Sequence, residues 1–301
     1  MCGLCGVLAV KDFNGMEDLM RELLCESTVR GKDATGIACN IGKRTSICKK
    51  AVSAYKFKFK IPKNTKAVIG HTRHSTQGSC KKNYNNHPFT GRCGDTTFAF
   101  AHNGIIINDS AIQRGLPETK IETDSYAAVQ LLEQSDRLDF ESIRNMAERI
   151  NGSFSFSILD NKNNLYLVKG DSPISLLYFH KPQIYVYAST DEILWKALIE
   201  SDLFDDVRNG KYEKIQISCG DILKISPDGQ TEYGHFSYAD NPLYERYNWR
   251  NYTAERNTEY MENLISAAAG MGISREEIEY LFECGLTYEE IEDYLYFGEE
   301  V

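Results

Sequence analysis

Hydrophobic and polar positions follow two different periods along this chain. The apolar run at 2–10 is typical of a buried strand, whereas residues 16–28 repeat leucines at helical spacing and predict a helix. Further short runs with β-branched or alternating residues predict strands at 35–40, 45–50, 66–73 and 96–107.

The middle of the chain predicts helices, and the part that follows predicts a long series of strands. Two helices are expected, at 123–135 and at about 139–150. Short apolar runs from 152 to 238, separated by Asn, Gly, Pro and Asp turns, predict an antiparallel series. Strands on both sides of a helical middle favour an α+β, multi-layer domain over a parallel doubly wound sheet.

The character of the sequence changes near residue 240. We expect a domain at 2–238, a polar linker rich in Tyr and Asn at 239–256, and an acidic helical appendage at 257–301. The appendage is either a cover for the core or a docking module, and the sequence leaves both interpretations open.

A small repeat lies within this appendage, after a helix expected near 257–269. In each copy a Glu follows Ser274 or Thr287 by three residues, at Glu277 and Glu290. A hydroxyl residue followed at this spacing by Glu is the capping-box signature of a helix start, so two short helices are predicted.

Composition is that of a globular protein, with 42% hydrophobic and 26% charged residues among 301. No run approaches the roughly 18 apolar residues of a membrane span, and no basic leader precedes the first apolar run. The nine scattered cysteines predict reduced thiols. We therefore expect a cytoplasmic protein that does not act at a membrane.

The net charge of −9 is concentrated at the end of the chain. Residues 254–301 hold 13 Asp and Glu against 2 Arg, so the remainder is close to neutral. No basic patch indicates nucleic acid as a partner.

Four stretches carry residue types suited to chemistry, in addition to the cysteine at position 2. They are RGKDATGIA (30–38), GHTRHSTQGS (70–79), AHNGIIIN (101–108) and ETDSYAAV (122–129). Each has an ordinary structural interpretation when taken singly: Arg73 a surface arginine, Asp124 a residue favoured by a helix dipole, and Asn103-Gly104 a hairpin turn. Their joint order behind Cys2 favours a functional one.

The ordered motifs resemble the glutaminase domain of class II glutamine amidotransferases, which are N-terminal nucleophile hydrolases. The resemblance covers roughly 2–235, and the glutaminase domain of glutamine:fructose-6-phosphate amidotransferase is the most similar pattern. It implies an enzyme with a four-layer αββα sandwich of two antiparallel sheets, here followed by a small helical appendage. It implies no cofactor and no metal.

The resemblance also implies how the reaction proceeds. Cys2 is the nucleophile once Met1 is removed, and its free α-amine, with a reference pKa of about 7.7–8.0, is the general base. The thiolate attacks the side-chain amide of L-glutamine and forms a γ-glutamyl thioester and ammonia. The side chain of Asn103 and the backbone N–H of Gly104 would stabilise the oxyanion.

Substrate binding is assigned by the same match. Arg73 would hold the α-carboxylate, Asp124 the α-ammonium group and Thr76 a further polar contact. Arg30 and His102 are expected to support the site. These assignments follow from the resemblance and from no other feature of the sequence.

Two features depart from the family pattern. The residue after Arg73 is His74 where the family has an aromatic residue, and Gln77 stands where it has a histidine. The sequence given has no room for a domain that consumes ammonia, so we expect a separate synthetase or ligase as partner.

Other functions stay open at this point. The same machinery could hydrolyse another γ-glutamyl amide, or the fold could be a non-catalytic binding or scaffold module that acts through the acidic tail. A metal site that includes the Cys2-x-x-Cys5 pair is a weaker alternative, because structural zinc sites join two closely spaced pairs.

Overall fold

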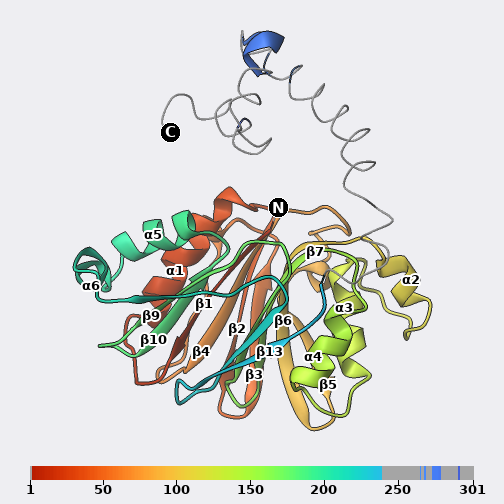
Figure 1. Cartoon of the computed structure of the whole chain (residues 1–301), viewed down its shortest axis with the longest axis horizontal. Helices are drawn as coiled ribbons and strands as arrows, with labels where there is room; N and C mark the ends of the chain where they lie inside the picture. Colours follow the sequence, from red (N-terminus) through yellow and green to blue (C-terminus); the bar gives the residue numbers. More distant parts are fainter. Residues whose placement is uncertain (1, 239–264, 266–267, 269–272, 279–290, 292–301) are drawn as a thin grey trace. The chain divides into compact units, whose positions relative to one another are not determined.

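Two antiparallel sheets lie face to face at the centre of the fold (Figure 1). The computed structural model describes residues 2–238, 265, 268, 273–278 and 291. The chain divides into two compact units, Met1–Asn241 and Pro242–Val301, and each is considered by itself.

The first sheet has seven strands, and its central strand β1 carries the N-terminal motif. In their order across the sheet the strands are β11 (Glu213–Ile215), β9 (Ser175–Phe179), β10 (Ile184–Ala188), β1 (Gly3–Ala9), β4 (Ala67–Arg73), β2 (Ala34–Ile41) and β3 (Arg44–Lys50). Every pairing is antiparallel.

The second sheet has six strands, also paired only in antiparallel fashion. Their order is β13 (Thr231–His235), β12 (Asp221–Ile225), β8 (Leu165–Lys169), β7 (Gly152–Asp160), β6 (Thr96–Ile106) and β5 (Phe89–Cys93).

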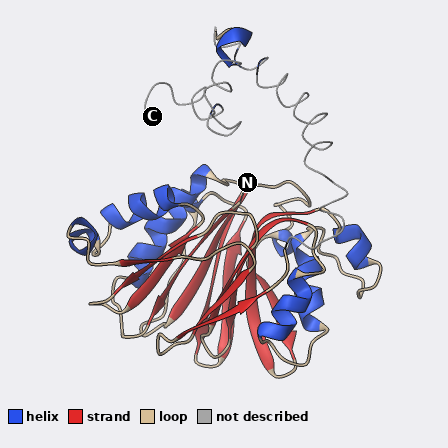
Figure 2. Ribbon diagram, in the orientation of Figure 1, coloured by secondary structure: helices blue, strands red, loops and turns tan. Residues whose placement is uncertain are grey.

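Helices cover the outer face of each sheet, as Figure 2 shows. Those that follow strands of the first sheet are α1 (Met16–Glu26), α5 (Asp191–Ile199) and α6 (Phe204–Arg208); those associated with the second are α2 (Asp109–Gln113), α3 (Ser125–Glu133) and α4 (Phe140–Ala147). Short 3-10 turns occupy Ser27–Val29, Ala54–Lys56 and Asn83–Asn85. The expected four-layer αββα sandwich is confirmed.

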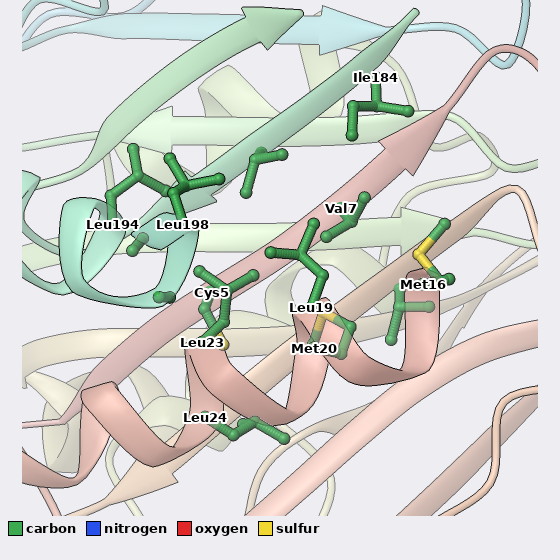
Figure 3. Packing of buried hydrophobic residues seen from close by; sticks show 14 of the residues in the cluster. Cys5, Val7, Met16, Leu19, Met20, Leu23, Leu24, Ile184, Leu194 and Leu198 are labelled. Carbon is green, nitrogen blue, oxygen red and sulfur yellow. The ribbon is translucent and has the colours of Figure 1, made fainter. Parts of the chain in front are cut away.

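Strand β1 shows why the sequence folds into these layers. All seven of its residues are buried, since the strand has helices on one face and the second sheet on the other. Cys5 and Val7 pack against Leu19 and Leu23 of α1 (Figure 3), whereas Leu4 packs between the two sheets. Alternate residues of a strand point to opposite faces, so this run is continuously apolar. Cys5 is a buried strand residue, as expected.

The sequence pattern did not predict all of the helices and strands. Helix α5 interrupts the series of strands expected between 152 and 238, and Thr190 caps it by accepting a hydrogen bond from Ile193 N. A hydroxyl residue followed by two acidic ones is a sequence signal for such a start. Helix α6, the short helix α2 and strand β5 were also not expected.

The second unit is described only in part. The linker and most of the appendage lie outside the described residues, including the second copy of the repeat. The first copy has the predicted capping box: Glu277 N donates to Ser274 Oγ at 3.2 Å, and Ser274 N donates to Glu277 Oε2 at 2.8 Å. The division at 239–256 and 257–301 stays a prediction.

No helix in the described part of the chain is both long and apolar enough to cross a membrane.

Candidate active site

Cys2 lies directly before β1, at the end of the sheet where β4 terminates. The two strands are antiparallel and Gly3 pairs with Thr72, so the start of β1 is adjacent to the end of β4. The Cys2 thiol donates to His74 O at 3.5 Å, and the Cys2 carbonyl accepts a 2.9 Å hydrogen bond from Arg30 Nε. Both chain segments therefore fix the position of this residue.

Strand alternation directs Cys2 and Asn103 into the same space between the two sheets. Leu4 belongs to the cluster between the sheets, and Cys2 lies on the same face of β1, two residues earlier. Ala99 and Ala101 of β6 belong to this cluster as well, so Asn103 lies on the matching face of β6. The site occupies one end of the inter-sheet space.

Three residues of the 30–38 motif contact the Cys2 backbone or the chain at the end of β4 and in the loop after it. Arg30 holds the Cys2 carbonyl. Gly31 passes so close to Arg73 that a Cβ would come within 2.4 Å of the Arg73 carbonyl carbon, so only glycine fits. Asp33 Oδ2 accepts a 2.7 Å hydrogen bond from Ser75 N and anchors the loop.

Arg73 is 3% exposed and its guanidinium is committed to the loop that follows it. Nη1 donates to Asn86 Oδ1 at 2.7 Å, and Nη2 donates to Gln77 O at 2.6 Å and to Gly78 O at 2.8 Å. These bonds use three of the five N–H donors of a guanidinium. Within the described residues two donors are left, which a ligand can use.

Asn103 and Gly104 lie inside β6 and not in a hairpin turn, paired with Ser155 and Phe154 of β7. Gly104 has φ +136°, and a Cβ there would lie 2.0 Å from Ser153 O, so no other residue fits. The Asn103 side chain is 1% exposed, and neither its Oδ1 nor its Nδ2 has a partner within the described residues. A buried amide without partners is costly, and a ligand can supply them.

Asp124 connects the site to helix α3. Its Oδ2 accepts a 2.7 Å hydrogen bond from Ile106 N, and its Oδ1 accepts from Ser125 Oγ at 3.2 Å. Ser125 Oγ also lies 2.8 Å from Nδ1 of His102. Since the backbone of β6 and the first turn of α3 both hold this carboxylate, its position is fixed before any ligand binds.

Burial controls the protonation of the thiol and of the histidines. Burial raises the pKa of the Cys2 thiol, and the charge of Arg73 acts in the opposite direction. Burial also lowers the pKa of His71 to about 3 and the pKa values of His87 and His102 below their ordinary range. Near neutral pH the thiol is protonated and the three imidazoles are neutral.

A cleft with an empty volume of about 260 Å³, partly open to solvent, joins these groups. Six of the eight residues expected in the site line it: Cys2, Arg73, Thr76, His102, Gly104 and Asp124. The other two adjoin residues that line it: Arg30 holds the Cys2 carbonyl, and Asn103 precedes Gly104 in β6.

Further residues line the cleft that the sequence reading did not assign to it, namely His74, Gln77, His87, Thr123 and Ser125. Their neighbours in the 70–79 and 122–129 motifs were the available signal for most of them. His87 lies outside these two motifs, directly before the Pro88 that precedes β5.

The structure gives no support for a metal centre. Within the described residues, no group of three His, Cys, Asp or Glu side chains is placed to hold a metal ion. Cys5 is buried against α1, on the helical side of β1, whereas Cys2 faces the space between the sheets.

Comparison with known proteins identifies a domain family. Residues 71–196 match the model of a family described as a glutamine amidotransferase domain. The chain is 28% identical over 247 residues to an amidophosphoribosyltransferase of Methanocaldococcus jannaschii, an alignment covering 77% of this chain and 50% of that protein. It is also 28% identical over 182 residues to a glutamine--fructose-6-phosphate aminotransferase of Streptococcus pyogenes, covering 57% and 30%.

The fold has relatives among solved structures. A glutamine phosphoribosylpyrophosphate amidotransferase from B. subtilis, solved with ADP and GMP, superimposes with a TM-score of 0.60 at 19% identity, over 78% of this chain and 49% of that one. The chain thus spans half or less of the length of these relatives. The expected resemblance to class II glutamine amidotransferases and the expected fold are confirmed.

Proposed function

We propose that this chain, which carries a class II glutamine amidotransferase domain of the N-terminal nucleophile type, hydrolyses the side-chain amide of L-glutamine through a thioester on Cys2. The observation that carries the proposal is the cleft itself. Four segments far apart in the sequence bring a thiol, a guanidinium, a glycine of β6 and a carboxylate, from Cys2, Arg73, Gly104 and Asp124, to one cavity. Glutamine presents the complementary groups: an amide, an α-carboxylate and an α-ammonium.

The nucleophile needs a base in the cleft. Because burial keeps the Cys2 thiol protonated, its proton must be removed during attack. Among the histidines that line the cleft, His87 and His102 are buried, and His102 has its Nδ1 directed to Ser125. We infer that the base is the α-amine of Cys2, exposed when Met1 is removed.

The first step forms the bond between Sγ of Cys2 and the amide carbon of glutamine. The thiol proton passes through the amine to the amide nitrogen, the C–N bond breaks and ammonia leaves. A water molecule then attacks the thioester, and its proton returns to the departing thiolate through the same amine. Glutamate leaves and the free thiol is restored.

The oxyanion of each tetrahedral intermediate would be held by Asn103 Nδ2 and the N–H of Gly104. The unpartnered state of the Asn103 amide supports this role, since a donor without a partner in the free enzyme can bind charge that develops later. Donors fixed in advance act without reorganisation at the moment of reaction.

The two charged groups on the α-carbon of glutamine would bind to opposite charges of the cleft. The remaining N–H donors of Arg73 would bind the α-carboxylate, and Asp124 the α-ammonium group. Thr76, on the exposed rim, would add a hydroxyl contact. Because both the α-carboxylate and the α-ammonium group would be bound, the cleft would select the free amino acid over a peptide.

We further propose that the ammonia serves a separate synthetase or ligase in the cytoplasm. The relatives are named as an amidophosphoribosyltransferase and a glutamine--fructose-6-phosphate aminotransferase, so their names point to different acceptors. The eight described cysteines are free thiols, which fits a reducing compartment.

Mass spectrometry and glutamine hydrolysis test the proposal together. The purified native protein should lack Met1, release glutamate and ammonia from glutamine, and gain one adduct at Cys2 with diazo-oxo-norleucine. Cys2→Ala should abolish hydrolysis and labelling. Cys219→Ala, which removes an exposed thiol between β11 and β12, is the matched control and should retain both. Hydrolysis that persists in Cys2→Ala would refute the proposal.

A further inference from the structure

Gln77 joins three parts of the site that are far apart in the sequence. Its Nε2 donates to Asp109 Oδ2 at 3.1 Å, its Oε1 accepts from Asp124 N at 3.2 Å, and its backbone carbonyl accepts from Arg73 Nη2 at 2.6 Å. The loop after β4, the start of α2 and the start of α3 therefore meet at one side chain.

The chemistry of these contacts requires a side-chain amide. Asp109 offers only acceptor oxygens when ionised, and Asp124 N is only a donor, so the residue between them must donate on one side and accept on the other. The side chain of Gln77 does both. A carboxylate in its place would still accept from Asp124 N but would repel Asp109.

The contacts add to other anchors of the same loop. Asp33 holds it through Ser75 N, the guanidinium of Arg73 holds its carbonyls at 77 and 78, and the amides of Asn85 and Asn86 donate to the carbonyls at 79 and 80. Gln77 itself is an exposed residue, so no hydrophobic burial holds its side chain. Its two side-chain hydrogen bonds join this loop to Asp109 of α2 and to the backbone of Asp124 before α3, in addition to the contacts that Lys82 and Asn85 make with Glu122.

We propose that Gln77 is a positioning residue that holds the 74–79 loop against Asp109 and the start of α3 before substrate binds. The inference rests on the proposed function for the identity of the ligand, L-glutamine. With the loop held, the carbonyls that orient Arg73 and the backbone of Asp124 are already in place. Loss of the link lowers the fraction of binding-competent protein, which raises KM and leaves kcat nearly unchanged.

A reversed pair of substitutions tests this link. Gln77→Glu places two carboxylates against each other and should raise KM for glutamine by about tenfold or more, with kcat changed less than about threefold. Gln77→Glu combined with Asp109→Asn restores a donor opposite an acceptor and should return KM to within about threefold of the native value. A double variant no better than Gln77→Glu alone overturns the proposal.

The matched control is Gln230→Glu, which adds the same charge at another exposed glutamine. Gln230 ends the turn whose Gly229 lies beside Val10, at the end of β1 opposite to Cys2. KM in this variant should equal the native value. An equal rise of KM in the control would show a general charge effect and overturn the proposal.

Hydrogen exchange separates this inference from the proposed function. In Gln77→Glu, peptides that contain 74–79 and Asp109 should exchange faster than in the native chain, and the double variant should restore the native rate. If neither the native chain nor the variants hydrolyse glutamine, the proposed function fails. Hydrogen exchange alone then tests whether Gln77 holds the loop. Unchanged exchange in Gln77→Glu overturns this inference.

Discussion

The space between the two sheets has two regions built on the same strands and the same faces. In its interior, Leu4, Leu8 and Ala101 are fully buried among other apolar side chains. At its open end, Cys2 and Asn103 continue the same faces of β1 and β6. Residues only two positions apart on the same face therefore have different roles: Leu4 and Ala101 pack in the interior, whereas Cys2 and Asn103 belong to the proposed site.

The two regions differ in what holds them together. The interior depends on apolar area and shape, where full burial of a leucine contributes about 1.5–3 kcal/mol. The open end depends on directed bonds, such as those from Arg73 to Asn86 and to the loop carbonyls. We therefore expect substitutions in the interior to change stability and substitutions at the open end to change activity.

Among the predicted variants, Asn103→Ala should separate a loss of activity from a loss of stability most strongly. If the Asn103 amide binds the oxyanion, kcat should fall by about 10²- to 10³-fold. The unfolding free energy should stay within about 1 kcal/mol of native, because the polar atoms that the variant removes are buried and have no partner in the described part of the chain. Steady-state kinetics and urea unfolding check this. Parallel losses of activity and stability would contradict the division.

The opposite result is expected for Leu8→Ala in the interior. Leu8 is fully buried at the end of β1 distant from Cys2, and the cavity should cost about 3 kcal/mol of unfolding free energy. Below the unfolding transition, kcat/KM for glutamine should stay within about twofold of native. Denaturant unfolding and kinetics on the same sample provide the comparison, and a tenfold loss of kcat/KM in folded protein would show that packing and site are not separate.

Acid should lower the stability of the fold through His71. Burial lowers the pKa of this histidine from its ordinary value of 6.5 to about 3, so the unfolded chain binds the proton more readily. The stability that this neutral imidazole contributes is complete above pH 6.5 and is lost as the pH falls toward 3.

Between pH 7 and pH 5 this effect should lower the unfolding free energy by about 2 kcal/mol, at 1.36 kcal/mol for each pH unit below 6.5. His71→Gln removes the titration and should lose less stability over the same interval than the native chain. Urea unfolding at the two pH values measures the difference. An equal loss in both proteins would exclude His71 as the cause.

The same contrast explains what could be predicted from sequence. Most strands of the two sheets and three of the helices followed from apolar periodicity, because burial against a sheet or a helix imposes a period of two or 3.6. Helix α5 was missed because its apolar residues lie inside a region dominated by strand patterns, and only the Thr190 cap marks its start.

The site was predictable as a set of residues and not as a set of contacts. The ordered motifs pointed to Cys2, Arg73 and Asp124, which the fold brings to one cleft. They could not show that three N–H donors of Arg73 bond to the chain that follows it, or that His87, shortly before β5, lines the cleft. Such contacts depend on long-range register, which local patterns do not contain.

The smallest predicted effect tests whether the second unit stands apart from both regions. Ser274→Ala removes the hydroxyl that accepts from Glu277 N and that also donates to Glu277 Oε2 at 3.0 Å. Loss of a helix N-cap costs about 1 kcal/mol, so the amide of Glu277 should exchange roughly fivefold faster or more, given that 1.4 kcal/mol corresponds to a tenfold change. Glutamine hydrolysis should not change, because the described residues that line the cleft all belong to the first unit. A change in kcat or KM in this variant would show that the acidic appendage acts on the site, and would make it a regulatory element of the proposed glutaminase.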